Sequence, residues 1–124
     1  MAWLKQIVVD CAHPAALARF WEQVLDGFAI RTYTDADLAD LAAEGLTPET
    51  DPVVLLDGPA LEVCFQQVDL EPVVKKPLHL DLVSSDRTAE VERLVGLGAT
   101  VVESFDAHTW MRDPEGNDFC LTDR

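Results

Sequence analysis

The chain has 124 residues and a mass of 13.7 kDa, about the length of one folded domain, so no separate cofactor domain is expected. Its 23 acidic residues against 9 Lys and Arg give a formal net charge of −14, which disfavours binding to nucleic acid or to an anionic membrane. Apolar runs such as residues 53–56 are too short to span a bilayer. Three cysteines without a CxxC spacing predict reduced thiols and a cytoplasmic protein.

The first half of the chain is typical of one strand, one helix and three more strands. The β-branched residues 6–10 predict the first strand. His13 at a cap-like position, Pro14 in the first turn and Gly27 as a stop predict a helix over residues 15–25. Three further strands are predicted at 28–33, 53–56 and 61–68.

The second half repeats this pattern. Residues 79–83 predict a strand, and a helix follows from Asp86 as its cap to Gly98 as its stop. Strands are predicted at 100–103, 109–112 and 118–121, with a DPEGN turn at 113–117. The sequence therefore predicts a single α+β domain of two βαβββ modules, about 1–70 and 77–124, joined by a proline-containing linker at 71–77.

One segment breaks the symmetry between the modules. Residues 35–44 place Leu38, Leu41 and Ala42 at helical spacing with acidic residues early, which predicts an inserted helix. Such a helix serves either as a lid or as a solvated cover for a sheet edge.

Strand alternation separates a polar face from an apolar one, because residues i and i+2 of a strand share a face. The apolar faces are expected to pack beneath the two helices. The polar faces cost free energy if buried without partners, so a cavity filled by water or a ligand is expected. The polar-face positions are Gln6, Val8, Asp10, Glu62, Cys64, Gln66, His79, Asp81, Asp118, Cys120 and Thr122.

Several local motifs accompany this pattern: residues 8–14 (VVDCAHP), Phe20-Trp21, Phe65-Gln66, residues 78–82 (LHLDL) and the closing residues 111–121 (MRDPEGNDFCL). Together they resemble the vicinal oxygen chelate superfamily, which includes glyoxalases, bleomycin-resistance proteins and extradiol dioxygenases, and more narrowly its small glyoxalase-like domain proteins. The resemblance implies that each module curls its mixed sheet into a cup. It also implies that two cups, from one chain or from a homodimer, enclose a site.

The resemblance further implies a divalent metal held by the first and last strands of each module. Those positions fall on Gln6, His79, Cys120, and Cys64 or Glu62. Only His79 matches the family's pattern, and an amide and thiols do not replace the hard ligands of such a site. No metal ligand is therefore predicted and the cofactor is left unknown, with a soft zinc site of Cys64, His79 and Cys120, completed by Glu62 or Gln6, as an alternative.

Two roles are predicted for the polar-face residues. His79 and Asp81 are the candidate catalytic residues. In one interpretation Asp81 orients the His79 imidazole, which acts as a general base. In the other, Asp81 is only the hydrogen-bond partner of His79 and the pair has no catalytic role. Trp110 shares a strand face with His108 and Arg112 and is a candidate ligand-stacking wall, whereas Arg112 is either an anion contact or an ion-pair partner. The candidate ligand-binding residues are Gln6, Glu62, Cys64, Gln66, Trp110, Arg112 and Cys120.

Three functions remain open at the level of sequence. The first is a homodimeric protein that binds a small organic ligand in a β-cup, without the family's usual metal. The second is a lyase, isomerase or dioxygenase that uses an unusual metal or the His79 and Asp81 pair. The third is an interaction module without a small ligand, because this kind of scaffold hosts many functions.

Overall fold

The computed structural model describes residues 1, 3–69 and 78–123. Contacts between residues divide the chain into two compact units, Met1–Glu71 and Pro72–Arg124, and each is described by itself. The linker predicted at 71–77 lies outside the described residues, and the single-domain organisation stays a prediction. No helix in the described part of the chain is long and apolar enough to cross a membrane.

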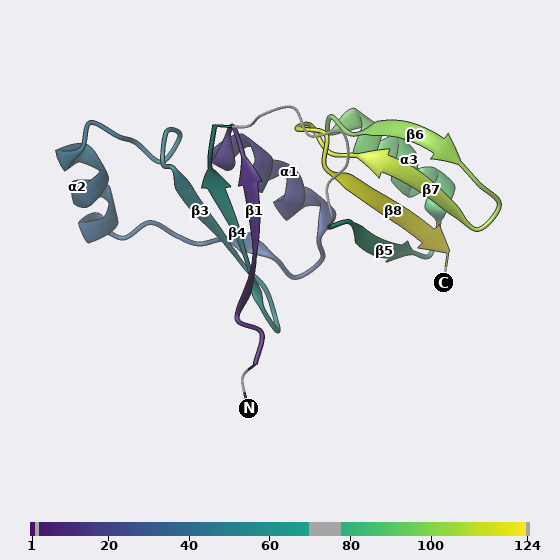
Figure 1. Cartoon of the computed structure of the whole chain (residues 1–124), viewed down its shortest axis with the longest axis horizontal. Helices are drawn as coiled ribbons and strands as arrows, with labels where there is room; N and C mark the ends of the chain where they lie inside the picture. Colours follow the sequence, from purple (N-terminus) through teal and green to yellow (C-terminus); the bar gives the residue numbers. More distant parts are fainter. Residues whose placement is uncertain (2, 70–77, 124) are drawn as a thin grey trace. The chain divides into compact units, whose positions relative to one another are not determined.

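The first unit is a four-stranded mixed sheet with two helices (Figure 1). The sheet order is β1-β4-β3-β2, with β1 parallel to β4 and the other pairs antiparallel. The elements are β1 (Gln6–Cys11), α1 (Pro14–Val24), β2 (Ala29–Ile30), α2 (Asp35–Ala43), β3 (Val53–Asp57) and β4 (Glu62–Gln67).

The second strand is shorter than the sequence predicts. A strand was expected over 28–33, but only Ala29–Ile30 has strand geometry. Ile30 pairs with Leu56, and the amide of Arg31 still donates to the carbonyl of Leu55 at 2.9 Å. Beyond that bond the chain turns away toward α2, because an edge strand has a partner on one side only.

The second unit has the same topology. Its sheet order is β5-β8-β7-β6, again with one parallel pair, β5 with β8. This equivalence confirms the predicted α+β fold of paired βαβββ modules. The elements are β5 (Leu80–Ser84), α3 (Arg87–Gly96), β6 (Thr100–Ser104), β7 (His108–Arg112) and β8 (Asp118–Asp123).

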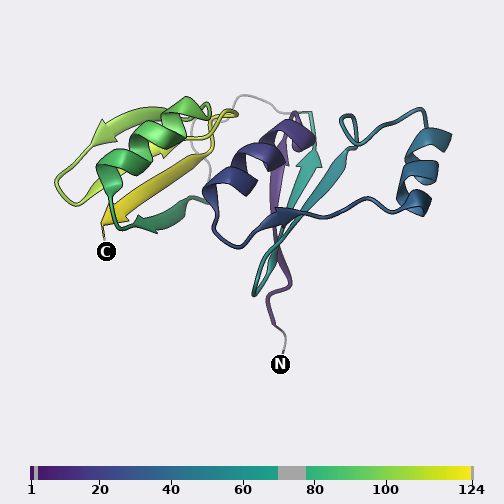
Figure 2. The same cartoon turned by 180° about the vertical axis from the view of Figure 1, so that it is seen from behind.

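Each sheet has a helix on one side, where the core forms (Figure 2). In the first unit α1 packs on β3 and β4 through Leu17, Phe20 and Trp21, all buried. The Phe20 and Trp21 rings meet edge to face with centroids 5.3 Å apart. In the second unit α3 contributes the buried Leu94. The apolar strand faces lie on this side, as the alternation predicts, and Phe65 and Phe119 are fully buried.

The inserted helix α2 is present where the sequence predicts it. Thr34 and Asp37 form a reciprocal capping box at its N-terminus. None of its residues is buried, and both views show it beyond β3 and clear of the strands (Figures 1 and 2). It therefore does not pack on the sheet through its apolar side.

Candidate functional site

The register of the first sheet places its predicted polar residues in adjacent rows. Glu62 lies opposite both Gln6 of β1 and Asp57 of β3. Cys64 lies opposite Val8 and Leu55, and Gln66 lies opposite Asp10 and Val53 in the same way. Because directly opposed residues share a face, these residues form one face, which we call polar face 1. It is the side of the sheet away from α1.

Arg31, which follows β2, forms ion pairs with the opposed residues Asp57 and Glu62 of polar face 1. The Nη2 atom of Arg31 lies 2.6 Å from Oδ1 of Asp57 and 2.8 Å from Oε1 of Glu62. These contacts raise the pKa of Arg31 and lower that of Asp57 through hydrogen bonding and charge. Glu62, the alternative first-module metal position, is thus the partner of a guanidinium in this structure.

The two cysteines that occupy family metal positions are not activated thiols. Cys64 is buried and Cys120 is half-buried. Burial raises the pKa of both thiols, and nearby carboxylates raise them further: Glu62 and Asp10 for Cys64, and Asp81 and Asp118 for Cys120. Raised thiol pKa values disfavour the thiolate that binds a metal or acts as a nucleophile.

The second sheet carries an equivalent polar face, polar face 2. Cys120 of β8 lies opposite Asp81 of β5 and Trp110 of β7. Asp118 lies opposite Arg112 in the neighbouring row. The predicted residues Asp81, Trp110, Arg112 and Cys120 therefore share one face.

A carboxylate joins the aromatic and cationic residues of polar face 2. Oδ1 of Asp118 accepts a hydrogen bond from Nε1 of Trp110 at 2.9 Å and another from Nε of Arg112 at 3.0 Å. The guanidinium carbon of Arg112 lies 5.4 Å from the centroid of the Trp110 ring, within the range of a cation–π contact. Arg112 is thus an ion-pair partner, and Asp118 fixes both side chains.

The DPEGN turn sets this geometry. Buried Asp113 accepts bonds from the amides of Glu115 and Asn117 and from the side chain of Asn117. Gly116 has φ +82°, a conformation that glycine adopts without strain. The closed turn brings β7 and β8 into antiparallel register, so Arg112 meets Asp118.

The candidate catalytic pair comes together but is exposed. Nε2 of His79 lies 3.4 Å from Oδ1 of Asp81, with side chains 58% and 69% exposed. His79 itself precedes β5, which begins at Leu80 rather than at residue 79 as predicted. The contact is of the kind expected if Asp81 orients the imidazole of His79. However, both side chains are in contact with solvent, and the interaction lacks the strengthening that a buried, water-free environment would give it.

The donor set does not fit the family's divalent metal. Among the described residues, no three His, Cys, Asp or Glu side chains converge so as to hold a metal ion. Within a unit, the family positions supply Gln6 with Cys64 or Glu62 in the first, and His79 with Cys120 in the second. Glu62 is already ion-paired with Arg31, and an amide, an imidazole and thiols do not replace the carboxylates of a Mg²⁺ or Mn²⁺ site.

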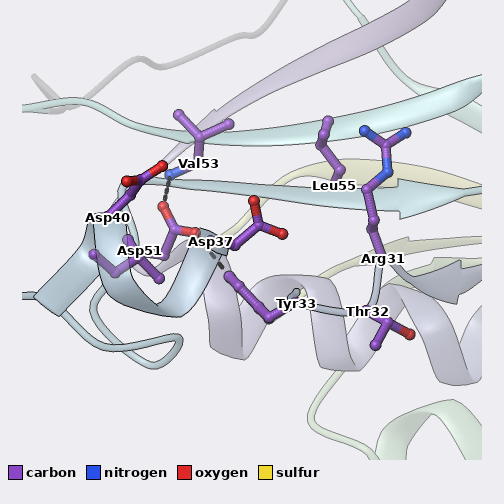
Figure 3. Close-up of a pocket in the computed structure, with 9 residues that line it drawn as sticks. Arg31, Thr32, Tyr33, Asp37, Asp40, Asp51, Val53 and Leu55 are labelled. Atoms are coloured by element: carbon purple, nitrogen blue, oxygen red, sulfur yellow. Dashed lines mark hydrogen bonds between the residues drawn. The ribbon is translucent and has the colours of Figure 1, made fainter. Parts of the chain in front are cut away.

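A pocket of about 310 Å³ lies in the first unit, between the chain after β2, the helix α2 and β3 (Figure 3). Val53 and Leu55, which belong to polar face 1, form part of its wall. The lining residues are Arg31, Thr32, Tyr33, Asp37, Asp40, Leu41, Asp51, Val53 and Leu55.

Sequence reasoning identified none of these lining residues as a site. The one available signal was the spacing of Asp37, Asp40 and Leu41, which places them on one side of a helix. The sequence placed Asp118 on the polar face but predicted no role for it. Its role as the shared hydrogen-bond acceptor of Trp110 and Arg112 follows from the pairing of β7 with β8.

Comparison with known proteins agrees with this architecture. A family model described as glyoxalase-like domain matches residues 6–122. A glyoxalase/bleomycin resistance protein/dioxygenase family enzyme from Burkholderia phytofirmans PsJN has a similar structure, with a TM-score of 0.69, 16% identity and 98% of each chain covered. A glyoxalase-related enzyme from Fulvimarina pelagi has a TM-score of 0.66 and 16% identity over 100% of this chain and 89% of its own. These likenesses concern the fold, and no curated protein matches the chain.

Proposed function

The chain belongs to the glyoxalase-like domain family, within the vicinal oxygen chelate superfamily, and from that premise we propose that it binds a small organic ligand on its polar faces without the family's usual metal. The observation that carries the proposal is the cluster of Trp110, Arg112 and Asp118. An indole held by hydrogen bonding is a rigid wall against which a planar ligand stacks at low entropic cost.

The unused donors of the cluster favour a ligand with a polar group beside its ring. Asp118 accepts a hydrogen bond from Nε–H of Arg112, whereas the two Nη atoms of Arg112 make no hydrogen bond with the described residues. A guanidinium held at one nitrogen presents its remaining N–H groups in a fixed direction. Cys120 beside Trp110 adds a small, uncharged surface.

The proposal is tested by nuclear magnetic resonance on the indole N–H signals. The chain has three tryptophans, so the Trp110 signal is assigned by its loss in Trp110→Phe. Titration with 2-naphthol, 2-naphthoate and quinoline is expected to move that signal, with Kd below about 1 mM for at least one probe. Trp110→Ala is expected to weaken that probe by about threefold to tenfold, the range of an aromatic contact.

Val95→Ala is the control, because Val95 is 47% exposed on α3 and lies on neither polar face. Its binding should equal that of the wild type. If no probe binds below about 1 mM, or if Trp110→Ala binds as the wild type does, the Trp110 cluster on polar face 2 is not a ligand site of this kind.

A second candidate function is supported by the contact of His79 with Asp81. An enzyme that uses this pair for proton transfer would lose turnover in His79→Ala while keeping its fold. Metal analysis of untagged protein purified without chelator separates this case from metal chemistry. A stoichiometric metal that is lost in both His79→Ala and Cys120→Ala would overturn the metal-free proposal.

We further propose a cytoplasmic homodimer as the working form. The free cysteines suit a reducing compartment. The apolar residues Trp3, Phe20 and Trp21 are the sequence's candidates for contacts with a partner subunit, but Phe20 and Trp21 are buried in the first unit, so only Trp3 of these three is exposed. Sedimentation of the wild type and of Trp3→Ala tests both the dimer and this contact.

A further inference from the structure

We propose that the pocket between the chain after β2, α2 and β3 binds a small organic cation with an apolar body. The residues that line this pocket belong to the first unit, whereas the Trp110 cluster belongs to the second, so each proposal is tested on its own residues. Its volume of about 310 Å³ is at the lower end of the range for small-molecule sites.

The apolar part of the pocket comes from β3 and α2. Val53 and Leu55 lie two residues apart and share one face of β3, and Leu41 lines the pocket from α2. Val53 is 44% exposed, and Leu41 and Leu55 are half-buried. An apolar body placed on these side chains would remove exposed apolar surface from water, which favours binding.

The charges around this apolar wall favour a cation. Asp37, Asp40 and Asp51 line the pocket together with a single arginine, Arg31. Arg31 is held by Asp57 and Glu62, so its charge is already offset. In Figure 3, Asp40 and Asp51 lie beside Val53, whereas the guanidinium of Arg31 lies by Leu55. The acidic end of the pocket is therefore not neutralised from within.

The three carboxylates are engaged to different extents. Asp51 accepts bonds from the hydroxyl of Tyr33 at 2.8 Å and from the amide of Val53 at 2.9 Å. Asp37 accepts a hydrogen bond from the backbone N–H of Thr34 in the capping box. Asp40 makes no hydrogen bond or ion pair with any described residue, so its carboxylate is the one left to meet a ligand's charge.

Tyr33 contributes a neutral polar group to the same pocket. Burial and the hydrogen bond to Asp51, with the charges of Asp51 and Asp37, raise the pKa of its hydroxyl far above the ordinary value. The phenol therefore stays protonated and adds no further charge. The same carboxylates that oppose a phenolate attract an ammonium or guanidinium.

The occupant is an organic cation rather than a metal ion. The lining carboxylates do not converge into a group that could hold a metal, as noted for all described residues. An apolar wall is also of no use to a hydrated metal ion, whereas it matches the carbon skeleton of an amine.

Three probes of nearly equal size and different charge test this site: tryptamine, tryptophol and indole-3-acetate. Titration of the ¹⁵N-labelled full chain is expected to shift the amides of residues 32–41 and 53–55. Tryptamine is expected to bind at least about fivefold more tightly than tryptophol, and indole-3-acetate most weakly. Added NaCl should reduce that preference, because Asp37 and Asp40 are solvent-exposed.

Asp40→Asn keeps the size of the side chain and removes its charge, and it should weaken tryptamine by about threefold to fivefold while leaving tryptophol unchanged. Asp35→Asn is the matched control, since Asp35 lies on the same helix but not in the pocket, and it should bind tryptamine as the wild type does. Absence of tryptamine binding, equal binding of tryptophol, or an Asp40→Asn variant that binds normally would each overturn the proposal. So would shifts confined to the second unit.

Discussion

One carboxylate organises the polar face of the second unit. Asp118 accepts bonds from both Trp110 and Arg112 on a single oxygen, so the indole and guanidinium orientations are coupled. In the first unit Arg31 plays the converse part, with one cation between Asp57 and Glu62. Alternation along the strands predicted that Trp110 and Arg112 share a face. The predicted DPEGN turn sets the register that places Asp118 opposite Arg112, whereas the hydrogen bonds from both side chains to one oxygen depend on side-chain orientations that no local pattern in the sequence specifies.

Two glycines illustrate how the same substitution has opposite effects at different residues. A Cβ added at Gly58 would lie 2.1 Å from a ring carbon of Phe28, whereas one added at Gly96 meets nothing within 4 Å. Gly58→Ala is therefore expected to lower the free energy of unfolding by about 1–3 kcal/mol through overpacking. Gly96→Ala should raise it by up to about 1 kcal/mol by reducing the entropy of the unfolded chain.

Chemical denaturation of both variants measures these changes. The two substitutions add the same methyl group, so each is the control for the other. A Gly58→Ala protein as stable as the wild type would contradict this expectation, because it would show that Phe28 moves aside at no cost.

At the scale of elements, the two helices that follow α1 differ in what holds them. Both begin with a side-chain cap, Thr34 for α2 and Asp86 for α3. However, α3 buries Leu94 against its sheet, whereas α2 has no buried residue. Short helices without packing are marginal in water, so the capping box carries a larger share of the stability of α2. The two roles expected of this segment, a lid or a solvated cover for a sheet edge, stay predictions.

Removal of each cap should therefore have different consequences. Thr34→Ala is expected to cost α2 about 1 kcal/mol, seen as faster amide hydrogen exchange in residues 35–43 with Tm almost unchanged. Asp86→Ala should lower the Tm by about 3–6 °C, because α3 unfolds together with its sheet. A Tm loss of similar size in both variants would mean that α2 is part of the cooperative core.

At the scale of the whole molecule, there are more carboxylates than basic side chains that could form ion pairs with them. Every arginine in the described part of the chain has a carboxylate partner: Arg19, Arg31, Arg87, Arg93 and Arg112. The formal net charge of −14 therefore reflects carboxylates that repel one another across the surface. Such repulsion opposes compact structure and is screened by salt.

Stability is therefore expected to increase with ionic strength. Raising NaCl from about 0.01 M to about 0.5 M at pH 7 should raise the Tm by a few degrees, because the Debye length shrinks from about 30 Å to a few ångströms. The control is the same scan near the sequence pI of 4.3, where the effect should vanish or reverse. A Tm that falls with salt at pH 7 would show that attractive ion pairs outweigh the repulsion.

The sequence by itself determined the repeated βαβββ order, the inserted helix, the Asp86 cap of α3 and the separation of each sheet into an apolar and a polar face. These features follow from hydrophobic periodicity and from turn and cap residues, which act over a few neighbouring positions. The prediction of a second strand over 28–33 was wrong because it also used only local preferences. These residues favour a strand, but at the edge of the sheet they have a pairing partner on one side only.

Only the tertiary structure decided which polar residues meet. Asp118 joins Trp110 and Arg112, Arg31 joins Asp57 and Glu62, and Tyr33 joins Asp51 through contacts set by strand register and by the path of the inserted segment. The pocket beside α2 likewise needs residues 31–33 and β3 to lie together, although about twenty residues separate them in the chain. Strand and helix patterns are local, whereas a binding surface is made by chain segments brought together on folding.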